Sequence, residues 1–214
     1  LSKLNTFGVP AKAEYLARFR DADELRSLLA MPDLQGLPRM VLGGGSNVLF
    51  TRDFPGAILL NEVPGITVVR EDERHVWVQA GAGVVWHRLV LHCVERGWGG
   101  LENLSLIPGK VGAAPMQNIG AYGVELKDVF DGLEAIDTAT GDLRLFFPED
   151  CRFGYRNSAF KQELRGRLVI TSVTFRLRKS GEVNTSYGDI RNVLQAMGVM
   201  QPGIADVSRA VIQI

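Results

Sequence analysis

One segment of the sequence could hold a phosphate group. The run Leu42-Gly-Gly-Gly-Ser-Asn-Val48 follows a stretch that is typical of a β-strand. Glycines at the end of a strand can turn successive backbone N–H groups inward and form a concave anion site, and Ser46 and Asn47 add side-chain donors. The run departs from the dinucleotide fingerprint and from the P-loop, because neither the third glycine nor Gly-Lys-Ser/Thr is present. An ordinary glycine-rich turn is therefore an alternative.

A second segment could line a flat ligand. Between Gly97 and Gly123, seven of 27 residues are glycine, where even spreading would give about three. Small residues let the main chain lie flat on a ligand, whose polar edge then meets backbone N–H and C=O groups. Such a lining suits a large planar ring that is partly apolar. Ile107 and Val111 would equally suit a buried loop packed on the core, although that alternative explains the glycines poorly.

A third segment could bind an acid group. In the run 151–158, Arg152 and Arg156 flank the aromatic residues Phe153 and Tyr155. Arginine presents a planar fork that suits a carboxylate or a phosphate, and it stays charged at any working pH. The alternative is a pair of surface arginines.

Histidine and cysteine predict no metal site. His87 and His92 are five residues apart on a predicted helix, which is a poor spacing for shared ligation, so we interpret them as surface or core-edge residues. Cys93 falls in the apolar stripe of that helix and is expected to be a packed thiol. Cys151 has no histidine partner nearby and is expected to be structural. Two cysteines are too few for a disulfide framework.

Composition limits the function classes. The 214 residues carry 24 basic and 24 acidic side chains, so the net charge is zero. A protein that binds nucleic acid or a membrane surface through bulk charge needs one sign in excess, and neither partner is expected. No apolar run of about 18 residues and no leader is evident. We expect a soluble, cytoplasmic protein of one large or two small domains.

The elements that must position these segments mix strands and helices. Strands are expected at 13–20, 39–42, 48–50, 57–60, 75–80, 132–137, 143–147 and 168–177, and helices at 84–96, 188–197 and 204–214, with a short one that starts at Asp21. A turn is expected at Pro55-Gly56. Because strands and helices do not alternate strictly, the pattern favours an α+β fold over a doubly wound sheet.

The ordered set of motifs resembles one enzyme family. Asn5-Thr-Phe-Gly8, Gly43-Gly-Gly-Ser-Asn-Val-Leu49, Gly100-Leu-Glu-Asn-Leu104, Ile107-Pro-Gly109, Gln117-Asn-Ile-Gly-Ala-Tyr-Gly123 and Cys151-Arg-Phe-Gly-Tyr-Arg156 occur in this order. Together they resemble the UDP-N-acetylenolpyruvoylglucosamine reductase (MurB) family over essentially all 214 residues. The run 185–189 resembles the tyrosine loop of the longer, type I form.

The resemblance implies a fold and a cofactor. The fold is a two-subdomain FAD-binding unit of the vanillyl-alcohol-oxidase/PCMH type (1–65 and 66–179), followed by the start of a separate substrate-binding domain (180–214). The cofactor is FAD, with its pyrophosphate against 43–47 and its ring and ribityl chain against 107–112 and 117–123. The implied FAD contacts are Leu42, Gly43, Gly44, Gly45, Ser46, Asn47, Val48, Ile107, Pro108, Gly109, Gly112, Gln117, Asn118, Gly120, Tyr122 and Gly123.

The resemblance also implies a reaction. NADPH reduces FAD, and UDP-N-acetylglucosamine enolpyruvate is then reduced to UDP-N-acetylmuramate, a step of peptidoglycan precursor synthesis. Arg156 matches the catalytic arginine of the family, and Tyr122, Tyr155 and Tyr187 match tyrosines near the substrate. We expect a monomer with these small-molecule partners.

One departure from the family matters. Its proton-donating serine and assisting glutamate lie C-terminal to the matched region, and no residue of the 214 corresponds to either. Without these two residues we expect the chain to be inactive by itself. We also expect it to be a piece of a longer polypeptide, because the helical pattern of 204–214 stops without an end signal. The alternatives are a non-catalytic FAD-binding module and a flavin oxidoreductase of the same fold with another substrate.

Overall fold

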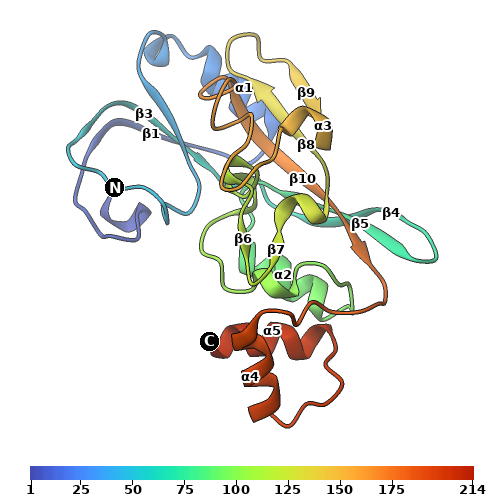
Figure 1. The fold of residues 1–214 in the computed structure, drawn as a ribbon. Coiled ribbons are helices and arrows are strands. Elements are labelled where there is room, and N and C mark those ends of the chain that lie inside the picture. Colours follow the sequence, from blue (N-terminus) through green and yellow to red (C-terminus); the bar gives the residue numbers. More distant parts are fainter.

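The computed structural model describes residues 1–214, whose main parts are two larger β-sheets and a C-terminal pair of helices (Figure 1). The first sheet uses strands between residues 13 and 61, and the second uses strands between residues 66 and 178. The helix pair follows the second sheet and lies beneath α2 in the view of Figure 1. No helix is both long and apolar enough to span a bilayer.

The first sheet is parallel. It comprises β1 (Ala13–Phe19), β2 (Arg39–Leu42) and β3 (Phe54–Asn61), in the order β1-β3-β2. The crossover between β1 and β2 contains α1 (Ala22–Ala30), whose N-terminus is capped because the Asp21 carboxylate accepts the N–H of Glu24. The expected strands at 13–20 and 39–42 and the helix start at Asp21 are confirmed.

Two expectations next to this sheet are wrong. Residues 48–50 form no strand, because the chain leaves the end of β2 through an irregular loop. Pro55 and Gly56 form no turn, because both lie inside β3. A Cβ atom on Gly56 would lie 2.1 Å from the carbonyl oxygen of Pro38, so glycine permits a close approach of two backbones.

The second sheet is antiparallel, with the order β4-β5-β10-β8-β9. Its strands are β4 (Ile66–Glu71), β5 (His75–Gly81), β8 (Phe130–Asp137), β9 (Leu143–Phe146) and β10 (Leu168–Arg178). The strands expected at 75–80, 132–137, 143–147 and 168–177 are confirmed to within two residues at each end. The sequence analysis missed β4, because this edge strand is almost wholly exposed and buries no alternating face.

The helices cover one end of the second sheet. Helix α2 (Trp86–Val94) packs the Trp86 ring against Phe175 of β10, with ring centroids 5.8 Å apart. It ends at Gly97 in the left-handed conformation, as expected. Helices α4 (Gly188–Ala196) and α5 (Ile204–Gln213) pack on each other. A hydrogen bond of 2.9 Å between the Ser105 and Ser208 hydroxyls joins α5 to the body of the protein. The short elements are β6 (Gly120–Ala121), β7 (Val124–Glu125) and α3 (Pro148–Cys151).

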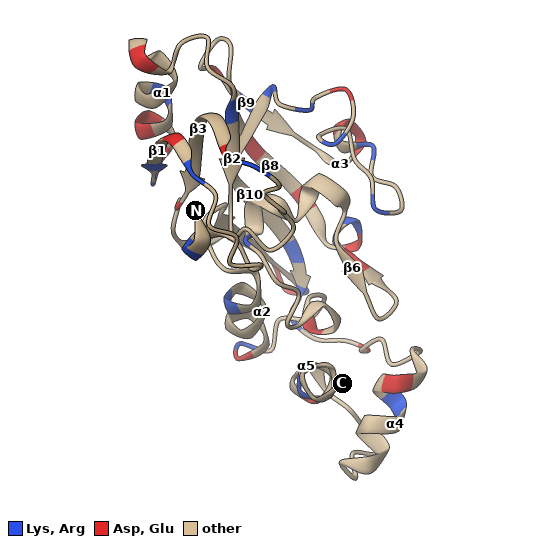
Figure 2. Cartoon of the chain, turned by 90° about the vertical axis from the view of Figure 1, so that its left-hand side faces the viewer, with Lys and Arg blue, Asp and Glu red and all other residues tan.

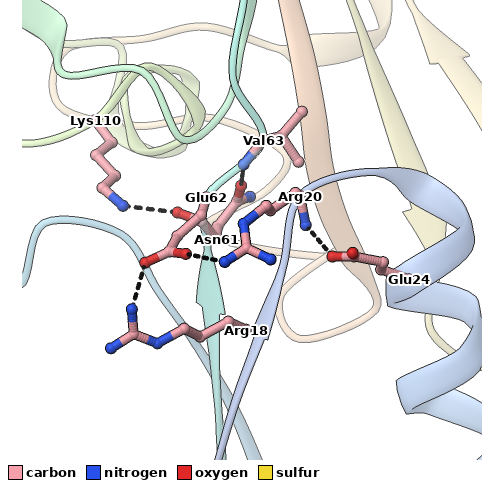
Figure 3. Close-up of polar contacts among 7 residues, drawn as sticks. All are labelled: Arg18, Arg20, Glu24, Asn61, Glu62, Val63 and Lys110. Atoms are coloured by element: carbon pink, nitrogen blue, oxygen red, sulfur yellow. Dashed lines mark hydrogen bonds and ion pairs between the residues drawn. The ribbon is translucent and has the colours of Figure 1, made fainter.

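One buried asparagine ties the two sheets together. Asn61, at the end of β3, donates from Nδ2 to the carbonyl of Ile170 in β10 at 2.9 Å, and its Oδ1 accepts the N–H of Val63 at 3.2 Å. Its own carbonyl accepts a 2.7 Å bond from the Lys110 ammonium (Figure 3). The side chain of the next residue, Glu62, pairs with arginines of the β1 segment. The position of Lys110, which lies in the glycine-rich segment 97–123, therefore depends on the junction of the two sheets.

We predict that Asn61→Ala lowers the free energy of unfolding by about 2 kcal/mol, because it leaves the carbonyl of Ile170 and the N–H of Val63 without partners in a buried place. Urea denaturation measures the change. Asn192→Ala, at an exposed position of α4, is the control and should change the value by less than about 0.5 kcal/mol. Equal stability of both variants would contradict this role of Asn61.

Candidate functional site

The two glycine-rich bends touch each other. A Cβ atom added to Gly44 would lie 3.3 Å from the Cα atom of Gly109, and one added to Gly109 would lie 3.1 Å from the Ser46 hydroxyl oxygen. Gly109 also has a φ of +116°, where only glycine is comfortable. A side chain at either glycine would push the bends apart. The two segments that the sequence analysis considered separately therefore form one surface.

The N-terminal segment supports the first bend. Gly45 has a φ of +65°, and its carbonyl accepts the N–H of Thr6 at 3.1 Å. A Cβ atom on Gly45 would lie 2.0 Å from the carbonyl oxygen of Leu4. Asn5 holds this segment in shape, because its side chain donates to the carbonyl of Leu1 at 2.9 Å and accepts the N–H of Val9 at 3.0 Å. The motif 5–8 is thus a backbone support for the bend.

Helix α2 supports the second bend. The backbone N–H of Trp86 donates to the carbonyl of Gly109 at 3.0 Å, and the Trp86 indole N–H donates to the carbonyl of Leu104 at 2.8 Å. The N–H of Leu106 donates to Nδ1 of His87 at 3.1 Å. These bonds hold both ends of the segment 104–109 to the first turn of the helix.

A cavity of about 990 Å³ opens beside the joined bends. Of the residues expected to contact ligand, those that line it are Ser46, Asn47, Val48, Ile107, Pro108, Gln117, Gly120 and Arg156. A second cavity of about 280 Å³ is mostly apolar and includes Gly43 and Gly112 in its wall. Both cavities are lined by Val41, Ala113 and Met116, so they adjoin. The smaller cavity is the more apolar of the two, and the larger one carries the charged residues.

The charged residues that line the larger cavity are all cations. Lys110, Arg156, Lys161 and Arg165 face it, and no carboxylate is among the lining residues. Elsewhere, as on α1, Figure 2 shows acidic and basic residues interspersed, and the whole chain is neutral. Burial lowers the pKa of Lys110, while the nearby Glu62 opposes this shift. A cavity with one sign of charge favours an anionic ligand.

Arg156 is held at the tip of a tight turn. The turn Gly154–Asn157 is closed by backbone bonds of 3.0 and 3.2 Å. Arg156 has a φ of +53° in it, a left-handed conformation that is costly for arginine. The side chains of Asn118 and Ser158 fasten the turn to the loop of the second bend, through bonds of 3.1 Å to the carbonyl of Gly154 and 2.7 Å to the carbonyl of Met116.

Backbone strain is concentrated in the segment 106–156, which includes the second bend and the arginine turn. The structure has five non-glycine residues with positive φ, namely Leu106, Asn118, Tyr122, Arg152 and Arg156. All of them lie between the start of the second bend and the arginine turn. Such residues persist only where the surroundings determine them, and they cluster at functional sites.

Some expected contact residues lie outside both cavity walls. The side chain of Asn118 is 1% exposed and is used within the protein, since its oxygen accepts the N–H of Lys127 at 3.0 Å. Leu42 is buried in the core beneath the first bend. Tyr122 and Tyr187 contact each other edge to face, 5.4 Å apart, next to the lining residue Ala121. Tyr155 is 86% exposed at the tip of its turn.

Gly44, Gly45, Gly109 and Gly123 shape the backbone beside the cavities without lining them. Arg152, the second arginine of its motif, pairs with Glu163 at 2.8 Å and does not line the cavity.

The sequence analysis missed several lining residues. The Trp86 indole packs in the core and also borders the cavity. Lys110 lies inside the glycine-rich segment, so its charge could have identified it as a candidate ligand contact from the sequence. Lys161 and Arg165 follow the arginine motif by a few residues, and only the fold shows that this loop faces the bends.

Comparisons of the sequence agree with the motifs. A family profile described as an FAD binding domain matches residues 13–145. The UDP-N-acetylenolpyruvoylglucosamine reductases of Amoebophilus asiaticus and Pseudomonas fluorescens are each 48% identical over 214 residues, which is 100% of this chain and 63% of theirs. That of Burkholderia orbicola is 51% identical over 199 residues, 93% of this chain and 57% of its own. The chain thus spans about three fifths of the length of these relatives, and the resemblance to their family is confirmed.

Comparisons of the structure agree with the expected fold. The crystal structure of MurB from Thermus caldophilus matches with a TM-score of 0.64 and 20% identity, over 100% of this chain and 91% of that one. The 6-hydroxy-D-nicotine oxidase from Arthrobacter nicotinovorans matches with a TM-score of 0.59 and 20% identity, over 79% of this chain and 37% of that one. The expected α+β fold of the vanillyl-alcohol-oxidase/PCMH type is confirmed.

We predict that Arg156→Gly raises the free energy of unfolding by about 0.5–1 kcal/mol, because glycine adopts the left-handed conformation of this position without strain. Urea denaturation measures the gain. Arg165→Gly is the control, since Arg165 is exposed on the same loop and its φ is not positive, and it should give no gain. A stability loss in Arg156→Gly as large as that in the control would show that the turn stores no strain.

Proposed function

The chain belongs to the FAD binding domain family, and from that membership we propose that it forms the FAD-holding part of a UDP-N-acetylenolpyruvoylglucosamine reductase. The observation that carries the proposal is the contact of the two glycine bends beside one cavity lined by cations. The names of the relatives at 48–51% identity support the choice of reaction. Because the chain spans part of those relatives, the activity is proposed for the polypeptide that carries these residues.

The residues present fit FAD. The close approach of Gly44 and Gly109 disfavours side chains at both positions, so backbone groups form the surface beside the cavity. The four lining cations complement a diphosphate, and the smaller, apolar cavity suits the adenine end of a dinucleotide. When bound, FAD supplies hydride transfer.

The protein's part in holding FAD is divided between the two bends. We propose that the bend 43–47 donates backbone N–H groups and the side chains of Ser46 and Asn47 to the diphosphate. We propose that 107–112 and 117–123 border the ring and the ribityl chain. Here Asn118, Tyr122 and Gly123 act by shaping the loop, because their polar groups form hydrogen bonds within the protein.

Arg156 is proposed to meet the acid group of the substrate. Its guanidinium can hold both oxygens of the enolpyruvyl carboxylate and stabilise the charge that grows there as the group becomes enolic. The strained turn holds the arginine backbone in place before substrate binds, which reduces the cost of orientation. Tyr122, Tyr155 and Tyr187 are proposed to contact the remainder of the substrate.

The remaining parts of the proposal concern the whole polypeptide. NADPH is proposed as the hydride donor, and a step of peptidoglycan precursor synthesis in the cytoplasm as the role. We assign no proton donor among residues 1–214. The boundaries 1–65, 66–179 and 180–214 remain proposed, and the residue ranges of the two sheets and the helix pair support them. A monomer is proposed as well.

We predict that the purified chain binds FAD and turns yellow. Gly109→Ala should weaken FAD binding at least about tenfold, because the new methyl group forces a strained φ and presses on the Ser46 hydroxyl. Isothermal titration calorimetry measures the affinity. Gly188→Ala, in open space at the start of α4, is the matched control and should bind like the wild type. A wild-type chain that takes up no FAD would contradict the proposal.

We predict a split between the two half-reactions in the polypeptide that carries these residues. In Arg156→Ala, NADPH should still reduce the bound FAD. Reoxidation of the reduced FAD by UDP-N-acetylglucosamine enolpyruvate should slow by about a hundredfold or more, because the charge that grows on the substrate carboxylate has lost the guanidinium that stabilises it. Stopped-flow absorbance under anaerobic conditions follows both. Arg152→Ala is the control, because Arg152 pairs with Glu163 outside the cavity. An unchanged reoxidation rate in Arg156→Ala would show that the assigned role is wrong.

A further inference from the structure

His87 lies directly behind the cavity wall. It follows Trp86, a lining residue, in the first turn of α2. Its Nδ1 accepts the backbone N–H of Leu106 at 3.1 Å. Leu106 has a φ of +58° and is 50% exposed, so little packing holds it in that conformation. The next two residues, Ile107 and Pro108, line the cavity. The imidazole therefore binds the residue at which the chain enters the second bend.

This hydrogen bond requires one form of the ring. A nitrogen that accepts an N–H cannot carry a proton, so the imidazole must be neutral with its proton on Nε2. The imidazolium carries protons on both nitrogens and would place an N–H against that of Leu106. Burial lowers the pKa of His87 below its ordinary value of 6.5, which keeps the ring neutral at neutral pH.

The carboxylates on the elements packed against α2 are paired with arginines and do not compete for the hydrogen bond between His87 and Leu106. The ionisable groups on α2 and on the elements packed against it (residues 102–104, β10 and α5) are Arg88, His92, Cys93, Glu102, Arg176, Arg178, Asp206 and Arg209. The Glu102 carboxylate lies 3.9 Å from Arg178, and the carboxylate of Asp206 pairs with Arg209. Burial is the one cause of the lowered His87 pKa, so no carboxylate counteracts it. Lys110, farther along the bend, is bonded to Asn61.

We infer that His87 is a positioning residue of the FAD site: its neutral Nδ1 holds Leu106 in the left-handed conformation, and so fixes the second bend against the first. The inference rests on the proposed function, because the ligand that benefits is FAD. Protonation of His87 removes the acceptor. The bend then loses one of its bonds to α2, while those made by Trp86 remain. The affinity for FAD should therefore be highest with neutral His87 and should fall as the pH falls through its lowered pKa.

The test is the dissociation constant of FAD from the chain, measured from about pH 8 to about pH 5.5 by calorimetry. In the wild type it should rise about two- to tenfold as the pH falls below 6.5, and then level off, because one hydrogen bond is lost. His87→Asn places an uncharged acceptor near the position of Nδ1, so it should bind FAD as the wild type does at high pH and show no rise. His87→Phe keeps a planar ring without an acceptor, so it should bind two- to tenfold more weakly at every pH.

Two controls separate this role from general effects. His92→Phe removes a second half-buried imidazole from the same helix, one that contacts Trp98 and not the bend. It should keep the wild-type pH profile. In the free chain, amide exchange measured by NMR should show a protected Leu106 N–H in the wild type and in His87→Asn, and an unprotected one in His87→Phe.

The outcomes are distinguishable. A wild type that binds no FAD at about pH 8 would overturn the proposed function, and this inference with it. FAD binding with the same pH profile in wild type, His87→Asn and His87→Phe would overturn the role of His87 alone. Far-UV circular dichroism establishes that each variant is folded. If His87→Phe unfolds, His87→Asn still tests the role of His87, because its affinity for FAD should not change with pH.

Discussion

The close approach of Gly44 and Gly109 is the constraint on which the rest of the structure depends. Two bends that belong to different sheets meet there, where an added Cβ atom would press on its neighbour at 3.1–3.3 Å and where the φ of +116° at Gly109 disfavours any other residue. Other parts of the fold serve this contact. The N-terminal segment holds Gly45 from one side, and α2 holds the segment 104–109 from the other. Asn61 joins the sheets that carry the bends.

This constraint explains how a neutral chain can have a cavity whose charged lining residues are all cations. The four cations come from two loops that the fold brings to the same cavity. None of these cations has a carboxylate opposite it within the cavity. Arg156 is the most strongly constrained of them, because its turn is fastened to the second bend by Asn118 and Ser158. The loop that would border the cofactor thus also orients the arginine that would meet the substrate.

Much of this could be predicted from local sequence. Strands with buried faces, the Asp21 cap and the helix end at Gly97 follow from short-range chemistry, and each was found near its expected place. The failures have long-range causes. β4 pairs at an exposed edge and has no apolar face to signal it. Gly56 was expected in a turn, but its missing side chain serves the approach of Pro38 from a neighbouring segment. In the site, the motif residues were identified as candidates, whereas Lys161, Arg165 and the bond between Leu106 and His87 depend on loops meeting in space.

The most direct test of the central claim is a crystal structure of the chain with FAD bound. The account predicts that the diphosphate lies against the backbone N–H groups of residues 43–47, with the ring in the cavity between Ile107 and Arg156 and with Gly44 and Gly109 still in contact. FAD bound elsewhere, for example in the separate cavity of about 640 Å³ that includes Arg88 and His92, would contradict it. So would a complex in which the two bends have moved apart.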